Sequence, residues 1–257
     1  MKKIWIYVVM ALITVMSAFG AAAAPESGEV VLAKLDATMK AEQKYMEQEM
    51  VLVTASGAER SRTVAVWNKI VDDEEMMLLR FLGPANVKGT GFLMKNDDMW
   101  LYLPALGKVK RIAGSAKQGS FMGSDLSYED MEALGSKGFA QTHQVKGLHE
   151  TKYGEASVYQ LALSPQDGAG SYSQLEILVD QELYLPLQII YYGRDGQALK
   201  KLTTFDHQQV DGRWVATRMQ MEDLKKGSKT VLKVNKVDFK ATIDDSVFST
   251  RSLERGI

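Results

Sequence analysis

Residues 78–112 read L-L-R-F-L-G-P-A-N-V-K-G-T-G-F-L-M-K-N-D-D-M-W-L-Y-L-P-A-L-G-K-V-K-R-I, and residues 120–130 read S-F-M-G-S-D-L-S-Y-E-D after a bridge rich in glycine and serine. The first stretch contains short strand-like runs that are separated by turn residues such as Gly-Pro and Asn-Asp-Asp. These runs carry no nucleophile and no metal-ligand spacing. This part of the chain therefore favours the binding of an apolar ligand over catalysis.

The strand-like runs are apolar on both faces. In the last of them, Trp100 and Tyr102 alternate with Met99 and Leu101, and a sheet that is apolar on both faces must be covered on both. We expect a helix on one face and a cavity for acyl chains on the other. Of the 14 methionines, eleven lie after residue 23, and they suit such a cavity because the flexible thioether adapts to varied apolar partners. Ordinary core packing explains any single methionine equally well. The candidate lipid-binding residues are Met77, Leu79, Phe81, Phe92, Met94, Trp100 and Tyr102.

Three cations, Lys108, Lys110 and Arg111, follow the last run closely. They form a candidate contact for the phosphate of a lipid headgroup, and a solvated strand end is the alternative interpretation. Residues 114–124 come next and are rich in glycine and serine, which is typical of a mobile surface loop. We expect this loop to be a lid over the opening of the cavity.

Composition limits the class of protein. The chain has 257 residues and no cysteine, which excludes disulfides, thiolate catalysis and a lipid anchor on an N-terminal cysteine. The 31 Lys and Arg balance the 32 Asp and Glu, so no large nucleic-acid-binding surface is expected. Residues 1–23 have the basic start, apolar centre and small-residue end of a cleaved signal peptide, and an uncleaved membrane anchor is the alternative. We expect residues 24–257 to form a single domain that works in a periplasm.

Periodicity predicts a mainly β (α+β) fold. Helical spacing predicts a helix from Ser27 to about Gln48, and Ser127 with Asp130 at the third helical position predicts a second, short helix that ends at Leu134. Most of the remaining chain alternates in the manner of strands joined by hairpin turns. Strands are expected at residues 47–54, 61–68, 75–82, 139–147, 155–164, 173–179, 185–192, 199–205, 214–221 and 230–239, in addition to the runs after residue 82. Such a set favours a curved, unclosed antiparallel β-barrel of about eleven strands covered by the two helices.

Patterns typical of an active site are missing from the sequence. The three histidines, His143, His149 and His207, have no second ligand at metal spacing, and no G-x-S-x-G motif occurs. Paired carboxylates at residues 72–73, 97–98, 129–130 and 244–245 lie in predicted turns or caps, where solvation and local hydrogen bonds explain them. We therefore predict no enzyme activity, no metal and no cofactor, with a hydrolase of unrecognised type as the remaining alternative.

A family resemblance is carried by three motifs: R-F-L-G-P-x-x-x-K-G-T-G-F-L at 80–93, D-M-W-L-Y-L-P-A-L-x-K-V-x-R-I at 98–112, and S-F-M-G-S-D-L-S-Y-E-D at 120–130. Their combination resembles the outer membrane lipoprotein-sorting protein family with a LolA-like domain. The resemblance implies a curved, unclosed antiparallel β-barrel with helices over an apolar cavity, and a periplasmic carrier for the acyl chains of lipoproteins or lipids. It also implies an inner-membrane RND-type exporter or an outer-membrane receptor as partner. The alternative function is a subunit that senses lipid or lipoprotein and regulates a membrane partner.

Overall fold

Thirteen antiparallel strands form one sheet in the computed structural model, which describes residues 26–72, 74–135, 138–166, 168 and 170–256. The signal peptide predicted at residues 1–23 lies outside the described residues. The first six strands are β1 (Gln43–Val53), β2 (Glu59–Val71), β3 (Glu74–Gly83), β4 (Gly91–Lys95), β5 (Asp98–Leu103) and β6 (Lys108–Ile112). The other seven are β7 (His143–Tyr153), β8 (Ala156–Pro165), β9 (Tyr172–Asp180), β10 (Pro186–Gly193), β11 (Ala198–Val210), β12 (Arg213–Asp223) and β13 (Ser228–Asp238).

The sheet consists of two meanders joined side by side. Strands β1 to β6 pair in sequence order, strands β7 to β13 do the same, and β1 pairs with β13. Within the described residues β6 and β7 each pair with one neighbour only, so the curved sheet is not closed. The predicted fold class, a curved and unclosed antiparallel β-barrel, is confirmed. The predicted count of about eleven strands was low, in part because the short cationic strand β6 carries little apolar signal.

The N-terminal helix α1 (Gly28–Met39) begins as predicted, since the Ser27 side chain accepts a hydrogen bond from the Val30 N–H. The prediction that this helix continues to about Gln48 was wrong, because α1 ends at Met39 and β1 begins at Gln43. Residues 43–48 pair with β2, and from Tyr45 onward they also pair with β13. The Tyr45 ring packs against Trp67 with centroids 5.2 Å apart. These cross-strand contacts override a local sequence that favours a helix.

The second helix, α2 (Tyr128–Ala133), also begins as predicted. The Ser127 side chain accepts from the Asp130 N–H, and the Asp130 carboxylate accepts from the Ser127 N–H, which completes a capping box. A third helix, α3 (Thr250–Arg255), follows a short 3-10 turn at Asp245–Val247 and was not predicted. Six residues are too few to show a helical period. Among the described residues, no helix combines the length and apolar character needed to cross a membrane.

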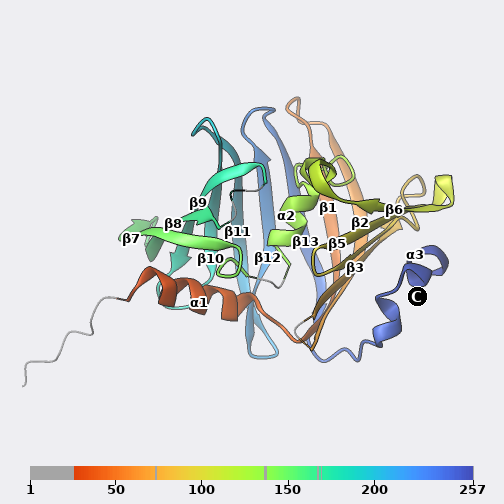
Figure 1. Ribbon diagram of the computed structural model, residues 1–257, viewed down its shortest axis with the longest axis horizontal. Helices are drawn as coiled ribbons and strands as arrows, with labels where there is room; N and C mark the ends of the chain where they lie inside the picture. The colour runs from red at the N-terminus through yellow and green to blue at the C-terminus, as the bar shows by residue number, and fades with distance from the viewer. Residues whose placement is uncertain (1–25, 73, 136–137, 167, 169, 257) are drawn as a thin grey trace, which may run out of the picture.

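The two faces of the sheet carry separate hydrophobic clusters. On the inner face, α1, α2 and the loop before α2 pack against both meanders, and this cluster includes Val31, Leu35 and Phe121. On the outer face, residues 241–253 pack against β3, β4 and β5, and this cluster includes Leu253. Figure 1 shows α1 crossing one end of the sheet, α2 lying over its middle, and α3 beside β3 and β5. A sheet that is apolar on both faces is thus covered on both, as expected.

Candidate functional site

Five of the seven residues predicted to bind lipid meet on the inner face. Met77, Leu79 and Phe81 lie on β3, and Phe92 and Met94 lie on β4, all buried in the inner cluster. The antiparallel register places Leu79 opposite Phe92 and Met77 opposite Met94. The two strands therefore present a continuous apolar surface, with two aromatic rings and flexible methionine side chains.

Trp100 and Tyr102 do not join this surface. They pack against the outer cluster, and Trp100 lies opposite Leu93, which belongs to that cluster. Because side chains alternate along a strand, the inner positions of β5 are those of Met99 and Leu101. The placement of Trp100 and Tyr102 with the other five residues was wrong, because both faces of β5 are apolar and alternation alone does not say which face is the inner one.

The three cations of the predicted headgroup contact are split between the two faces of β6. Val109 lies opposite Tyr102, and Arg111 lies opposite Trp100, where Arg111 forms an ion pair with Asp98. Lys108 and Lys110 alternate with them and are exposed on the other side of the strand. The structure therefore does not bring Lys108, Lys110 and Arg111 together as one site.

The inner face is filled by residues 119–135, which comprise the S-F-M-G-S-D-L-S-Y-E-D motif and α2 and which we call the plug. Phe121, Leu126 and Tyr128 of the plug are buried, and Phe121 is fully so. The Phe121 ring centroid lies 6.1 Å from that of Phe81 and 5.3 Å from that of Phe92. The side chains of the plug therefore occupy the space that was predicted for acyl chains.

A tight turn at the start of the plug directs Phe121 inward. The backbone φ angles of Met122 and Gly123 are 52° and 76°, a left-handed conformation that favours glycine. The Ser124 N–H donates to the Phe121 carbonyl at 3.0 Å, and the Phe121 N–H donates to the Leu126 carbonyl at 2.7 Å. The predicted lid at residues 114–124 therefore has two parts: Gly114–Gln118 forms an exposed 3-10 turn with no buried residue, and Phe121 is inside the molecule.

Two carboxylates in the middle of the plug anchor it to distant parts of the sheet. Asp125 accepts hydrogen bonds from the Thr230 hydroxyl at 2.7 Å and the Ser228 hydroxyl at 2.5 Å, both on β13. Glu129 accepts from the Ser171 N–H at 3.0 Å and from the Ser171 hydroxyl at 2.9 Å, just before β9. The plug is thus held by specific polar contacts as well as by its apolar side chains.

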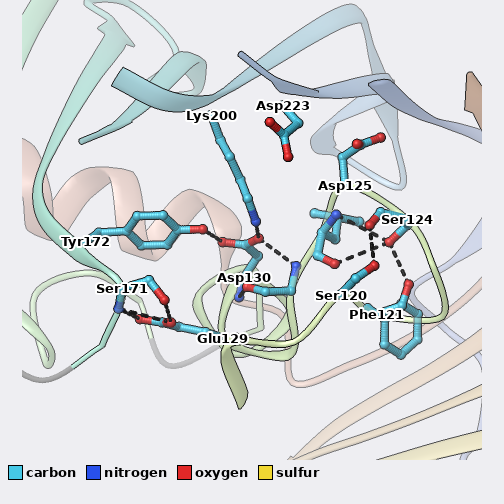
Figure 2. A network of polar contacts seen from close by, with 12 residues as sticks. Ser120, Phe121, Ser124, Asp125, Glu129, Asp130, Ser171, Tyr172, Lys200 and Asp223 are labelled. Atoms are coloured by element: carbon cyan, nitrogen blue, oxygen red, sulfur yellow. Dashed lines mark hydrogen bonds and ion pairs between the residues drawn. The ribbon is translucent and has the colours of Figure 1, made fainter. Parts of the chain in front are cut away.

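A third carboxylate, Asp130, is fully buried between the plug and the sheet (Figure 2). It accepts from the Tyr172 hydroxyl at 2.7 Å and forms an ion pair of 2.5 Å with the Lys200 ammonium. Burial, together with the negative charge of Asp130, raises the pKa of Tyr172 far above its usual value of 10.0. The prediction that solvation explains Asp130 was wrong: its local cap with Ser127 is present, but its main partners come from β9 and β11.

The remaining features of the described part of the chain offer no catalytic constellation. No group of three or more His, Asp or Glu side chains among the described residues is placed to hold a metal ion. A surface depression of about 530 Å³ lies by the β2–β3 turn, and its lining includes Asp72, Glu74 and Lys95. Its polar lining does not suit an acyl chain, and it is separate from the inner face.

Sequence reasoning missed the partners of the plug on the sheet: Ser171, Tyr172, Lys200 and Thr230. Tyr172 and Lys200 lie 42 and 70 residues from Asp130, and Thr230 lies 105 residues from Asp125. No local pattern marks any of them, since Tyr172, Lys200 and Thr230 are single polar residues at inner positions of their strands and Ser171 lies just before β9. Only the acidic members of these pairs lie in the motif at residues 120–130 that the sequence singles out.

Comparisons with known proteins agree with this architecture. A family model described as "Uncharacterized protein" matches residues 73–255, and none of the curated proteins matches the chain. The crystal structure of a DUF1329 family protein from Desulfovibrio piger is 29% identical, with a TM-score of 0.82 over 88% of this chain and 97% of that one. The crystal structure of a domain from Vibrio parahaemolyticus, named for outer membrane lipoprotein sorting, is 30% identical, with a TM-score of 0.81 over 89% of this chain and 98% of that one.

A more distant structure shares the fold. A LolA superfamily protein from Nitrosomonas europaea is 20% identical, with a TM-score of 0.72 over 88% of this chain and 98% of that one. At this identity the likeness concerns the fold alone. It places the unclosed sheet and its inner helices among LolA-like architectures.

Proposed function

The chain belongs to the outer membrane lipoprotein-sorting protein family with a LolA-like domain, and we propose that it is a periplasmic carrier that binds the acyl chains of lipoproteins or lipids on its inner face. The observation that carries this proposal is the apolar inner surface of β3 and β4, which is covered by a separate plug rather than by another sheet. Acyl chains bind where Phe121, Leu126 and Tyr128 now lie, so binding requires displacement of the plug.

Plug and acyl chain bury comparable amounts of apolar surface. Burying a large apolar side chain contributes about 1.5–3 kcal/mol, so the three plug side chains together contribute roughly 5–9 kcal/mol. An acyl chain contributes about 0.8 kcal/mol for each buried CH₂, so roughly six to eleven methylenes replace the apolar contacts of the plug. Acyl chains of ordinary length exceed this number. The apolar burial lost when the plug leaves is therefore offset by that of a bound acyl chain.

The proposed location and partners rest on the family resemblance rather than on the geometry. We propose that the protein works in the periplasm, after export by the signal peptide predicted at residues 1–23. An RND-type exporter in the inner membrane or a receptor in the outer membrane is the proposed partner that delivers or accepts the ligand. A pull-down from solubilised membranes, with and without added lipid, tests this part of the proposal.

The test of the carrier function is native mass spectrometry of protein purified from its own periplasm. We expect bound lipid or acylated peptide in the wild type and loss of that ligand in Met94→Gln, which keeps the volume of a buried inner side chain but adds an amide. Trp100→Ala is the matched control, because Trp100 lies one strand away on the outer face. Circular dichroism verifies that both variants fold. Wild-type protein that is consistently empty and has no affinity for acylated peptides refutes the proposal.

A further inference from the structure

The plug is acidic throughout. Residues 119–135 contain Asp125, Glu129, Asp130 and Glu132 and no basic residue. The groups that meet three of these carboxylates on the sheet side are hydrogen-bond donors: hydroxyls on β13 and at the start of β9, the Tyr172 hydroxyl and the Lys200 ammonium. The inner face therefore presents a surface that is built to receive negatively charged oxygen atoms.

Asp130 occupies the most enclosed part of this surface. Its side chain is 0% exposed and that of Lys200 is 16% exposed, so the ion pair is withdrawn from water. Removing two charges from water is costly, and an uncompensated buried charge is costlier still. If the plug leaves, Lys200 loses the carboxylate that compensates it. Asp223 lies opposite Lys200 on β12 and is the neighbouring carboxylate. It already accepts hydrogen bonds from the N–H groups of residues 225 and 226 and from the Lys226 ammonium, so it is engaged elsewhere.

A second observation points to a ligand at the same place. Tyr191 lies on β10 opposite Lys200, and its ring centroid is 4.9 Å from that of Tyr172. The side chain is 1% exposed, and within the described residues its hydroxyl has no hydrogen-bond partner. Buried hydroxyls are rarely left in this state. The two oxygens of Asp130 are already engaged, one by Tyr172 and the other by Lys200 and the Ser127 N–H.

We propose that the inner face binds anionic amphiphiles, and that the plug is an internal mimic of such a ligand. The negatively charged headgroup, a carboxylate or a phosphate, takes the place of Asp130 on Lys200, Tyr172 and Tyr191. The acyl chain takes the place of the apolar plug side chains. A phosphate offers more acceptor oxygens than a carboxylate, and so satisfies the Tyr191 hydroxyl that Asp130 leaves without a partner. This inference rests on the carrier function proposed above and names its ligand class.

Amphiphiles with one chain length and different headgroups test the proposal, and isothermal titration below their micelle concentrations measures their affinities. The probes are dodecanoate, dodecyl phosphate, the neutral dodecyl maltoside and the cationic dodecyltrimethylammonium. We expect the two anionic probes to bind at least about tenfold more tightly than the neutral one, because hydrogen bonds to charged groups are stronger than those between neutral groups. The comparison of dodecanoate with dodecyl phosphate distinguishes a fatty-acid-like from a phospholipid-like headgroup.

Two substitutions should act in opposite directions. Lys200→Met removes the cation that holds both the headgroup and Asp130, and should lower the affinity for the anionic probes about tenfold relative to that for the neutral probe. Asp130→Asn removes the competing charge of the plug and should tighten the anionic probes, and it keeps the proposal testable if Lys200→Met does not fold. Asp125→Asn loosens the plug without touching Lys200, and should tighten all the probes alike. Lys201→Met is the matched control, because Lys201 alternates with Lys200 onto the outer face, where it pairs with Glu222.

The outcomes separate this inference from the proposed function. Equal binding of all four headgroups, unaffected by Lys200→Met and Asp130→Asn, overturns the headgroup site but leaves the carrier function standing. Absence of binding for all four probes, even in Asp125→Asn, overturns both. Affinity for the anionic probes that falls in Lys200→Met, rises in Asp130→Asn and is unchanged in Lys201→Met supports the proposal.

Discussion

Phe121→Ala should open the plug while the sheet remains folded. The ring is fully buried and contacts the aromatic rings of Phe81, Phe92 and Tyr128, the last with centroids 5.5 Å apart. Truncating a buried phenylalanine to alanine costs about 3–5 kcal/mol, which includes the loss of apolar burial and the cavity left behind. Because the plug docks on strands that pair with one another independently of it, this cost should reduce the free energy of local opening more than that of global unfolding.

Hydrogen–deuterium exchange resolved by peptide measures this effect. A loss of about 3–5 kcal/mol should raise amide exchange in residues 119–135 by roughly 10²- to 4 × 10³-fold, while peptides from β8 to β11 keep their wild-type protection. Leu253→Ala is the control, since it removes a fully buried side chain of the outer cluster and should leave exchange in the plug unchanged. Equal acceleration in the plug and in β8 to β11 contradicts the reasoning, because the plug would then be an inseparable part of the core.

Three further predictions concern charged side chains. Burial lowers the pKa of Lys44 from 10.5 to about 8, so its charged form destabilises the fold at every pH below about 8. Lys44→Met should therefore stabilise the protein by about 1–3 kcal/mol at pH 7 in urea titrations, and the gain should fade as the pH rises toward 10.5, where Lys44 is neutral in both the folded and the unfolded state. Arg80 donates to the Leu253 carbonyl in α3 at 3.1 Å, so Arg80→Met should cost about 1–3 kcal/mol and speed proteolysis near the C-terminus. Burial is the largest cause that raises the pKa of Glu132 above 4.5, and a hydrogen bond with Asp97 is the next. The folded state therefore disfavours the ionised carboxylate, so the contribution of Glu132 to the stability of the wild type falls as the pH rises above 4.5. Glu132→Gln should raise the melting temperature at pH 7 but not at pH 4.

Most neighbouring strands of the sheet could be predicted from the sequence because turn residues mark where one strand ends and the next begins. The Asp211-Gly212 turn has φ angles of 50° and 78°, as a two-residue hairpin requires, and it joins β11 to β12. Each such turn makes its two flanking strands antiparallel neighbours, so both meanders follow from short-range signals. The pairing of β1 with β13 carries no such signal, because its partners, such as Met50 and Leu232, are far apart in the chain.

The end of α1 shows where local preference fails. Residues 41–44 are Ala-Glu-Gln-Lys, all good helix formers, yet β1 begins at Gln43. A strand between two neighbours gains hydrogen bonds and cross-strand contacts along both edges, and this gain exceeds a helix propensity of a few tenths of a kcal/mol per residue. Such a tertiary contribution is invisible in the sequence around the boundary.

The candidate site was predictable in its apolar half and not in its polar half. Alternation grouped residues that share a face of β3 or β4, such as Leu79 on β3 and Phe92 on β4, and the structure places both of these on the inner face. It did not distinguish inner from outer on β5, and so misplaced Trp100. The contact of Asp130 with Lys200 joins two charged residues 70 positions apart, and each of them alone is typical of a solvated surface.

The unclosed edge between β6 and β7 has a mechanical consequence. In a closed barrel, the number of strands and their stagger fix the diameter, and an enclosed ligand must match it. Within the described residues this sheet ends at β6 and β7, so its circumference is not fixed in that way. Small changes of twist between neighbouring strands can widen or narrow the whole sheet while every strand pairing is kept. Under the proposed carrier function, the sheet can therefore accommodate ligands of different size, with the strain distributed over all of its strands.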